Sequence, residues 1–256
     1  MSRLAIENRP GGLGGSFLDT LAATAGAMGR QVRRVPTSGS SEPDEIAVVW
    51  NGKLFHPGGP TLYCEHGWLP RGEFQVSPGG VNADSHLAPF VWDGSPLPGA
   101  AADQVERRLE AIRTATHAAG VEMRTAEPPA DDLPGDFLLV PLQMEWDTNV
   151  ERHVPARFRR MQGLIDAVTE ARPPWPVVYK QHPSDVPGGS AQLQLRPGRP
   201  QDVVRPHATG NVHQLLKSGR CRGIVSLNSN VVHDGLLWDV PAVVLGRNVW
   251  PRTGPG

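Results

Sequence analysis

Four short segments place polar and charged side chains where they could bind a substrate or move a proton. In the segment 224–246, a β-branched stretch ends in small polar residues directly before an apolar stretch of helical character. These polar residues are Ser226, Asn228, Ser229 and Asn230. Hydroxyl and backbone N–H groups at the start of a helix suit an anion, so the segment predicts a phosphate-binding turn. The alternative is that Ser229 or Asn230 only caps that helix.

The second segment puts a cation and an imidazole directly after an apolar strand. Lys180 and His182 follow the predicted strand 177–179. Open α/β sheets bind ligands beyond the carboxyl ends of their strands. We therefore expect these side chains to neutralise the negative charge of a leaving phosphate group. The alternative is that His182 simply ends a strand.

The third segment lies within residues 56–100, which are rich in Gly, Pro, Asn and His and predicted to be irregular. Glu65, His66, Asp84 and His86 crowd this stretch, as expected for a general base beside an acceptor. Their spacing matches no zinc signature, so no metal site is predicted.

The fourth segment follows the predicted strand 137–140. Gln143, Asp147 and Asn149 could hydrogen-bond a ribose or another sugar, or could be polar turn residues that cap the next element. The glycine-rich turn around Gly14 lacks the ending of a P-loop and the spacing of a dinucleotide fingerprint. That turn suits the close approach of an acceptor.

Composition limits the classes of protein to which this chain can belong. Of its 256 residues, 39% are hydrophobic and 20% charged, which suffices for a core and excludes wholesale disorder. Two cysteines exclude a disulfide framework and fit a reducing cytoplasm. A net charge of -1 excludes a uniformly basic nucleic-acid binder. No apolar run is long enough to span a membrane, and the N-terminus has no signal pattern, so we expect a cytoplasmic protein.

Strands and helices alternate in both halves, which predicts parallel sheets with right-handed crossovers. In the first half we predict strands at 4–6, 31–35 and 46–50, with helices at 17–28 and 103–119. In the second half we predict strands at 137–140, 177–179, 223–226 and 242–245, with helices at 157–171, 212–217 and 231–238. A proline-rich linker at 127–135 would separate a domain of residues 1–130 from one of residues 136–256. The expected fold is two Rossmann-like α/β domains facing a cleft.

In this order, the four segments resemble the capsule-polysaccharide-synthesis family of glycosyltransferases, which includes bacterial Kdo transferases. The matching pieces are residues 65–71 with 79–85, 141–143 with 147–149, 180–183, and 226–229 through 239–246. The resemblance implies a GT-B fold and donor phosphate contacts at His182, Ser226, Asn228 and Ser229. To this predicted donor site we add Lys180, Asn230 and Gln143.

The resemblance also suggests a general base in the acceptor loop. Glu65 is the first choice, with Asp84 and His66 in reserve. The predicted acceptor-binding residues are Gly14, Trp68, Arg71, Asn82 and His86. The expected reaction is a single, inverting displacement at the anomeric carbon of a nucleotide sugar, with UDP as the expected nucleotide. The sequence has no Asp-x-Asp pair, so no metal or other cofactor is expected.

The acceptor that the sequence favours is the hydroxymethyl group of 5-hydroxymethylcytosine in bacteriophage DNA, modified in the host cytoplasm. The chain is short and nearly neutral, which suggests a soluble acceptor. Its arginines cluster at 30–34 and 152–160, and Trp50, Trp68 and Trp92 could stack on a flipped base. A capsule or other surface polysaccharide is the alternative acceptor. An epimerase and a non-catalytic sugar-binding protein are further alternatives. An oxidoreductase is disfavoured because neither half opens with the glycine motif of a dinucleotide-binding fold.

Overall fold

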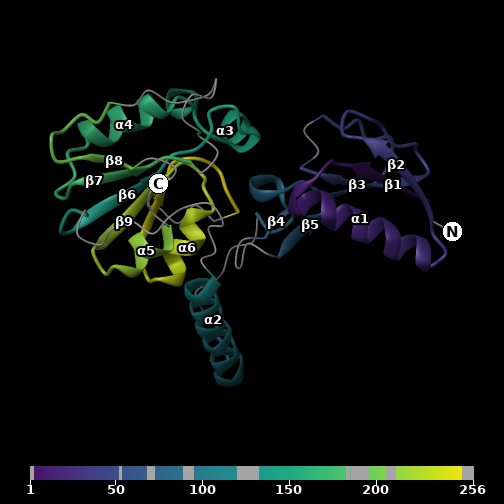
Figure 1. Ribbon diagram of the computed structural model, residues 1–256, viewed down its shortest axis with the longest axis horizontal. Helices are drawn as coiled ribbons and strands as arrows, with labels where there is room; N and C mark the ends of the chain where they lie inside the picture. Colours follow the sequence, from purple (N-terminus) through teal and green to yellow (C-terminus); the bar gives the residue numbers. More distant parts are fainter. Residues whose placement is uncertain are drawn as a thin grey trace. The chain divides into compact units, whose positions relative to one another are not determined.

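The structure, a computed structural model, describes residues 3–51, 54–67, 73–88, 95–119, 133–182, 185, 196–205 and 212–249. The chain forms two α/β units (Figure 1). Unit 1 comprises Met1–Asp93 with Asn248–Gly256, and unit 2 comprises Gly94–Arg247. The predicted α/β class with two Rossmann-like units is confirmed. The predicted division between residues 130 and 136 differs from this one, and the predicted linker lies, up to residue 132, outside the described residues. That the two units face a shared cleft stays a prediction.

Unit 1 is built on a five-stranded sheet with the order β2-β1-β3-β4-β5. Its strands are β1 (Arg3–Asn8), β2 (Gln31–Pro36), β3 (Glu45–Trp50), β4 (Thr61–His66) and β5 (Phe74–Ser77). The first four are parallel and β5 runs antiparallel to β4. Helix α1 (Gly12–Ala27) covers the sheet face that buries Ile6, Val48 and Cys64.

Strands β4 and β5 correct the expectation that residues 56–100 are irregular. Only Cys64 is fully buried in β4, so the local sequence lacks the apolar alternation that marks a strand. Pairing holds the strand in place instead, because β4 lies between β3 and β5. Glu65 and His66 therefore lie on a strand rather than in a loop.

Helix α1 begins at Gly12, five residues before its predicted start. The glycines permit close packing at this point. A Cβ atom on Gly14 would lie 2.7 Å from the indole ring of Trp50, and one on Gly15 would lie 2.7 Å from the carbonyl oxygen of Arg9. Glycine at these two positions thus allows the first turn of α1 to pack directly against Trp50 and the backbone of Arg9.

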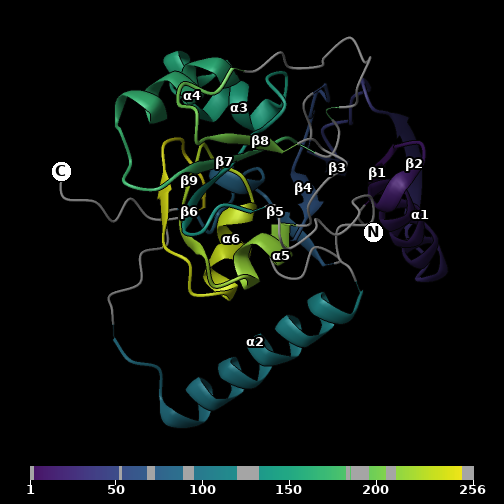
Figure 2. The ribbon, with the colours of Figure 1, turned by 60° about the vertical axis from the view of Figure 1, so that its left-hand side comes forward.

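Unit 2 contains a fully parallel sheet with the order β10-β9-β6-β7-β8. Its strands are β6 (Phe137–Pro141), β7 (Val177–Lys180), β8 (Val203–Arg205), β9 (Cys221–Ser226) and β10 (Ala242–Val244). Its described helices are α2 (Gly99–Ala119), α3 (Thr148–His153), α4 (Met161–Glu170), α5 (Val212–Lys217) and α6 (Val231–Leu237). The described residues also include a 3-10 turn in each unit, η1 (Asn82–Asp84) in unit 1 and η3 (Ala156–Phe158) in unit 2. Helices α3 and α4 lie over one face of the sheet and α5 and α6 over the other (Figures 1 and 2).

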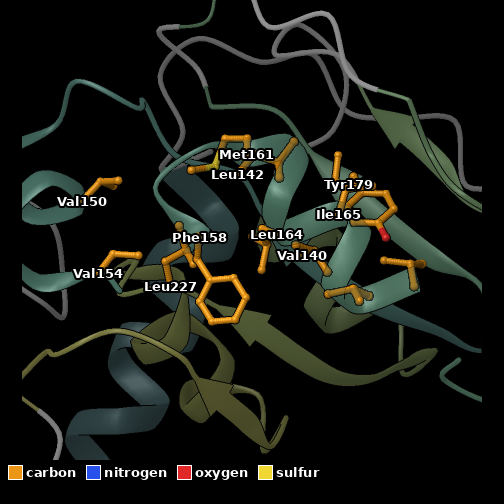
Figure 3. Packing of buried hydrophobic residues seen from close by; sticks show 12 residues of the cluster. Val140, Leu142, Val150, Val154, Phe158, Met161, Leu164, Ile165, Tyr179 and Leu227 are labelled. Carbon is orange, nitrogen blue, oxygen red and sulfur yellow. The ribbon is translucent and has the colours of Figure 1, made fainter. Parts of the chain in front are cut away.

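Both faces of this sheet are buried, as a parallel sheet requires. The core beneath α3 and α4 includes Leu164, Ile165 and Tyr179 (Figure 3). Burial raises the pKa of Tyr179 to about 12. The other core lies beneath α5 and α6 and includes Leu215 and Ile224. In the described part of the chain, no helix has the length and apolar character needed to cross a bilayer.

Candidate functional site

The carboxyl edge of the unit 2 sheet gathers the residues predicted to bind the donor. Strand β6 lies between β9 and β7, and all three run in the same direction. Ser226 ends β9, Lys180 ends β7, and Gln143 follows β6 by two residues. Ligands of open α/β sheets bind at this edge. The topology thus brings three separate sequence segments together.

A buried amide pair ties two loops of this edge together. The Gln143 Nε2 donates to Asn228 Oδ1 at 2.9 Å, and the Asn228 backbone N–H donates to Gln143 Oε1 at 3.2 Å. Asn228 Nδ2 donates to the carbonyl oxygens of Asn149 (2.9 Å) and Arg247 (3.3 Å). Gln143 and Asn228 are only 8% and 7% exposed. These side chains therefore hold the loops after β6 and β9 together. The sequence alone did not predict this contact.

The turn after β9 is also closed by its own hydroxyl groups. The Ser229 N–H donates to Ser226 Oγ at 3.1 Å, and the Val231 N–H donates to Ser229 Oγ at 3.3 Å. Ser226 is fully buried, and the Asn230 side chain makes no capping hydrogen bond. The expected phosphate site was built on backbone amides, but three of them, including that of Asn228, already donate within the unit. Half-buried Ser229 and Asn230 are the members of this turn with exposed surface.

Two basic side chains lie side by side at the ends of β7 and β8. Lys180 and Arg205 are register partners, and they are 2% and 6% exposed. Lys180 Nζ donates to the carbonyl oxygen of Gln181 at 3.1 Å, and half-buried His182 follows. Adjacent buried cations favour an anion at this edge. The sequence analysis missed Arg205 because it missed β8, and the signal was the cation after the apolar pair 203–204.

In unit 1, four of the residues predicted for the acceptor side, Glu65, His66, Asn82 and His86, lie on or beside the hairpin of β4 and β5. Glu65 lies opposite Gln75, and its carboxylate accepts the His66 backbone N–H at 2.9 Å. Gln75 Nε2 donates to the carbonyl oxygen of His66 and to Asn82 Oδ1, and the Asn82 N–H donates to Gln75 Oε1. Gln75 thereby joins the end of β4 to the turn η1.

A cavity of about 310 Å³ lies beside this hairpin. It is lined by Gly67, Glu73, Phe74, Gln75, Val76, Ser77, Ser85, His86 and Leu87. His86 is a predicted acceptor residue, and its backbone N–H donates to Ser77 Oγ at 3.1 Å. The lining also includes Glu73, a carboxylate that the sequence analysis missed. Glu65 is absent from this lining, and Asp84 is exposed on η1.

Trp50, which ends β3, and the buried Glu7 lie next to the end of β4. The rings of Trp50 and His66 meet edge to face, with centroids 4.9 Å apart. The buried Glu7 carboxylate accepts the Trp50 backbone N–H at 2.5 Å. Burial, together with the nearby charges of Glu7 and Glu65, raises the pKa of Cys64 to about 12. Both carboxylates therefore lie near Cys64, and the sequence analysis had overlooked Glu7.

Trp68 and Arg71, both predicted to bind the acceptor, lie outside the described residues. Within the described ranges, no three His, Cys, Asp or Glu side chains gather as a group that could hold a metal ion.

The sequence profile of one family, described as "Capsule polysaccharide biosynthesis protein", matches residues 101–254, which is more than half of the chain. The chain belongs to this family. The match covers the carboxyl-edge residues of unit 2 that were predicted to bind the donor. None of the curated proteins searched matches this chain significantly.

Two solved structures share its fold along nearly the whole chain. One is Thermosulfurimonas dismutans KpsC, beta Kdo 2,4 transferase, at 17% identity and a TM-score of 0.68, covering 97% of this chain and 81% of that one. The other is Thermosulfurimonas dismutans KpsC, beta Kdo 2,7 transferase, at 16% identity and a TM-score of 0.61, with coverages of 97% and 80%. The similarity extends over both units, so unit 1, most of which lies outside the family match, also shares the fold of these structures.

Proposed function

We propose that this protein is a glycosyltransferase that moves a sugar from a nucleotide-activated donor to a hydroxyl group of a surface polysaccharide. The observation that carries the proposal is the family match over the unit whose carboxyl edge holds Lys180, Arg205 and Ser229. The Kdo transferases that share the fold support a Kdo-like sugar as the group transferred. The donor nucleotide expected from the sequence remains UDP. The alternative donor is CMP-linked Kdo.

The proposed chemistry divides between the two units. In unit 2, the cations at the ends of β7 and β8 and the half-buried Ser229, Asn230 and His182 would stabilise the charge of the leaving nucleotide. In unit 1, a carboxylate would remove the proton of the acceptor hydroxyl as that oxygen attacks the anomeric carbon. Glu65 remains the first candidate for this base.

Glu73 is a rival base, because it lines the cavity beside the hairpin whereas Glu65 does not. A single displacement without a metal remains part of the proposal, and it predicts inversion of the anomeric configuration.

A glycan acceptor is better supported than DNA. Three of the seven arginines in the clusters that suggested DNA binding form ion pairs within the protein. The ion pairs are Arg33 with Glu45, Arg34 with Asp19, and Arg160 with Glu145. Trp50 is 5% exposed and packs against other rings, so it is not available to stack on a flipped base. The family description also names polysaccharide biosynthesis, and no comparison points to DNA modification.

The experiment is an intact-mass assay of transfer. The purified protein is incubated with CMP-linked Kdo or UDP-linked hexoses, with either a Kdo-terminated oligosaccharide or hydroxymethylcytosine DNA as acceptor, with and without EDTA. We expect the oligosaccharide to gain one sugar, with an inverted anomeric centre by NMR and no effect of EDTA. A mass gain on the DNA alone would overturn the glycan acceptor.

Variants then identify the base and separate the remaining readings. Glu65→Gln should lower kcat by at least about 100-fold, whereas Glu110→Gln, on an exposed surface of α2, should not. If Glu73→Gln is inactive and Glu65→Gln active, the base is Glu73. Conversion of the donor without any acceptor would indicate an epimerase. Nucleotide-sugar binding with no turnover for any acceptor would indicate a sugar-binding protein.

A further inference from the structure

One tryptophan at the carboxyl edge of unit 2 has no role in the core. Trp146 lies in the loop after β6, and 58% of its surface is exposed. Met144, two residues earlier in the same loop, is 4% exposed, so one apolar side chain of the loop is buried and the other is exposed. A large exposed aromatic side chain at a ligand-binding edge is informative, because aromatic groups of this kind commonly form contact surfaces.

The polar residues on both sides of Trp146 are fixed by hydrogen bonds. Glu145 Oε1 accepts the Met161 backbone N–H at 2.8 Å, and its Oε2 pairs with Arg160 at 2.6 Å. On the other side, Asp147 Oδ1 accepts the Asn149 backbone N–H at 2.7 Å. The backbone on either side of the indole is thus anchored to α4 and to the start of α3.

The loop is also closed on itself and tied to the turn after β9. The Asp147 N–H donates to the carbonyl oxygen of Met144 at 2.9 Å, which forms a tight turn around Trp146. Gln143, at the start of the loop, forms the buried amide pair with Asn228. A rigid aromatic side chain with few rotatable bonds loses little entropy when a ligand stacks on it. The loop therefore holds the backbone of exposed Trp146 in place at the carboxyl edge of the sheet, where the turn after β9 also begins.

We propose that Trp146 stacks on the nucleobase of the donor. The inference rests on the proposed function, since it assumes that a nucleotide occupies this edge. The described residues of the edge offer hydroxyls, amides and cations for ribose and phosphate, and Trp146 adds the π-face that a base requires. Stacking tolerates every base, so Trp146 contributes affinity for the nucleotide without selecting its identity.

The test measures binding of CMP, UMP and ribose 5-phosphate by titration calorimetry or by competition with the donor. We expect Trp146→Ala to weaken CMP and UMP binding about tenfold and to leave ribose 5-phosphate binding within twofold. Trp146→Phe should retain most of the affinity. Trp175→Phe is the matched control, because Trp175 precedes β7 and lies at the opposite edge of the same sheet. It should bind all three ligands like the wild type.

Three outcomes would overturn the inference. Trp146→Ala could bind nucleotides like the wild type. It could weaken CMP and ribose 5-phosphate equally, which would indicate a disturbed edge instead of lost stacking. It could raise only the KM of the glycan acceptor, which would assign the indole to acceptor binding. If the wild-type protein itself binds no nucleotide, the proposed function fails, and this result is distinct from a failure of the stacking inference.

Discussion

Replacing Asn228 by alanine tests whether the buried amide pair organises the donor edge. The substitution leaves the backbone N–H bond to Gln143 Oε1 in place but removes three side-chain hydrogen bonds, one with Gln143 and two with the carbonyl oxygens of Asn149 and Arg247. At about 1 kcal/mol for each bond, the free energy of unfolding should fall by about 3 kcal/mol. For a unit of this size, the melting temperature should fall by roughly 6 to 12 °C.

The assay is urea unfolding of four proteins, namely the wild type, Gln143→Ala, Asn228→Ala and the double variant. Both single substitutions remove the bond between Nε2 of residue 143 and Oδ1 of residue 228, so this loss would be counted twice in their sum. The double variant should therefore be more stable than additivity predicts, by about 1 kcal/mol. Donor KM should rise in Asn228→Ala, because Ser229 adjoins the altered residue.

Two results would refute this reasoning. Strict additivity of the two substitutions would show that Gln143 and Asn228 are not coupled. A loss of stability below about 0.5 kcal/mol for Asn228→Ala would show that the loop carbonyls find other partners at no cost. Either result would remove the amide pair from the account of how the donor edge is positioned.

Two further predictions concern unit 1. A hydrogen bond from Arg33 lowers the pKa of Glu45 from 4.5 to about 2, so this carboxylate contributes stability above pH 4.5 that is lost as the pH falls towards 2. In urea unfolding at pH 7, Glu45→Gln should be less stable than the wild type by up to about 3 kcal/mol, a figure that the partial exposure of Arg33 reduces. The difference in stability between the two proteins should disappear by pH 2. A difference that does not change with pH would contradict this prediction. Gly14→Ala should lower stability by about 1 to 3 kcal/mol, because the added Cβ would lie 2.7 Å from the Trp50 ring, and combining it with Trp50→Leu should recover part of the loss; failure of this rescue would point to a different role for the glycine.

The sequence predicted the central strands well because a parallel strand covered on both faces must be apolar along its length. The expected strands at 177–179 and 223–226 lie within β7 and β9. Strands β4, β5 and β8 were missed because pairing with neighbouring strands holds them in place, and a single sequence does not reveal that pairing. Missing β8 concealed Arg205, whereas Glu65 and His66 of β4 were singled out although their strand was not predicted.

The site was predicted by residue type and position but not by orientation. Ser226 and Asn228 were correctly placed at the end of a strand, yet their burial gives them a positioning role that composition could not show. Trp146 was overlooked because an exposed tryptophan and a core tryptophan look the same in one sequence. Its exposure follows from the fold of the loop, in which Met144 is buried and Glu145 and Asp147 are held by hydrogen bonds.

The central claim is that this family member transfers a sugar to a glycan hydroxyl. The most direct test is the mass of a defined oligosaccharide acceptor after incubation with a nucleotide-activated sugar and the wild-type protein. The account predicts a gain of one sugar residue for each nucleotide released. The claim would be contradicted if no glycan gained a sugar and no nucleotide were released. It would also be contradicted if the sugar appeared on modified DNA and on no glycan.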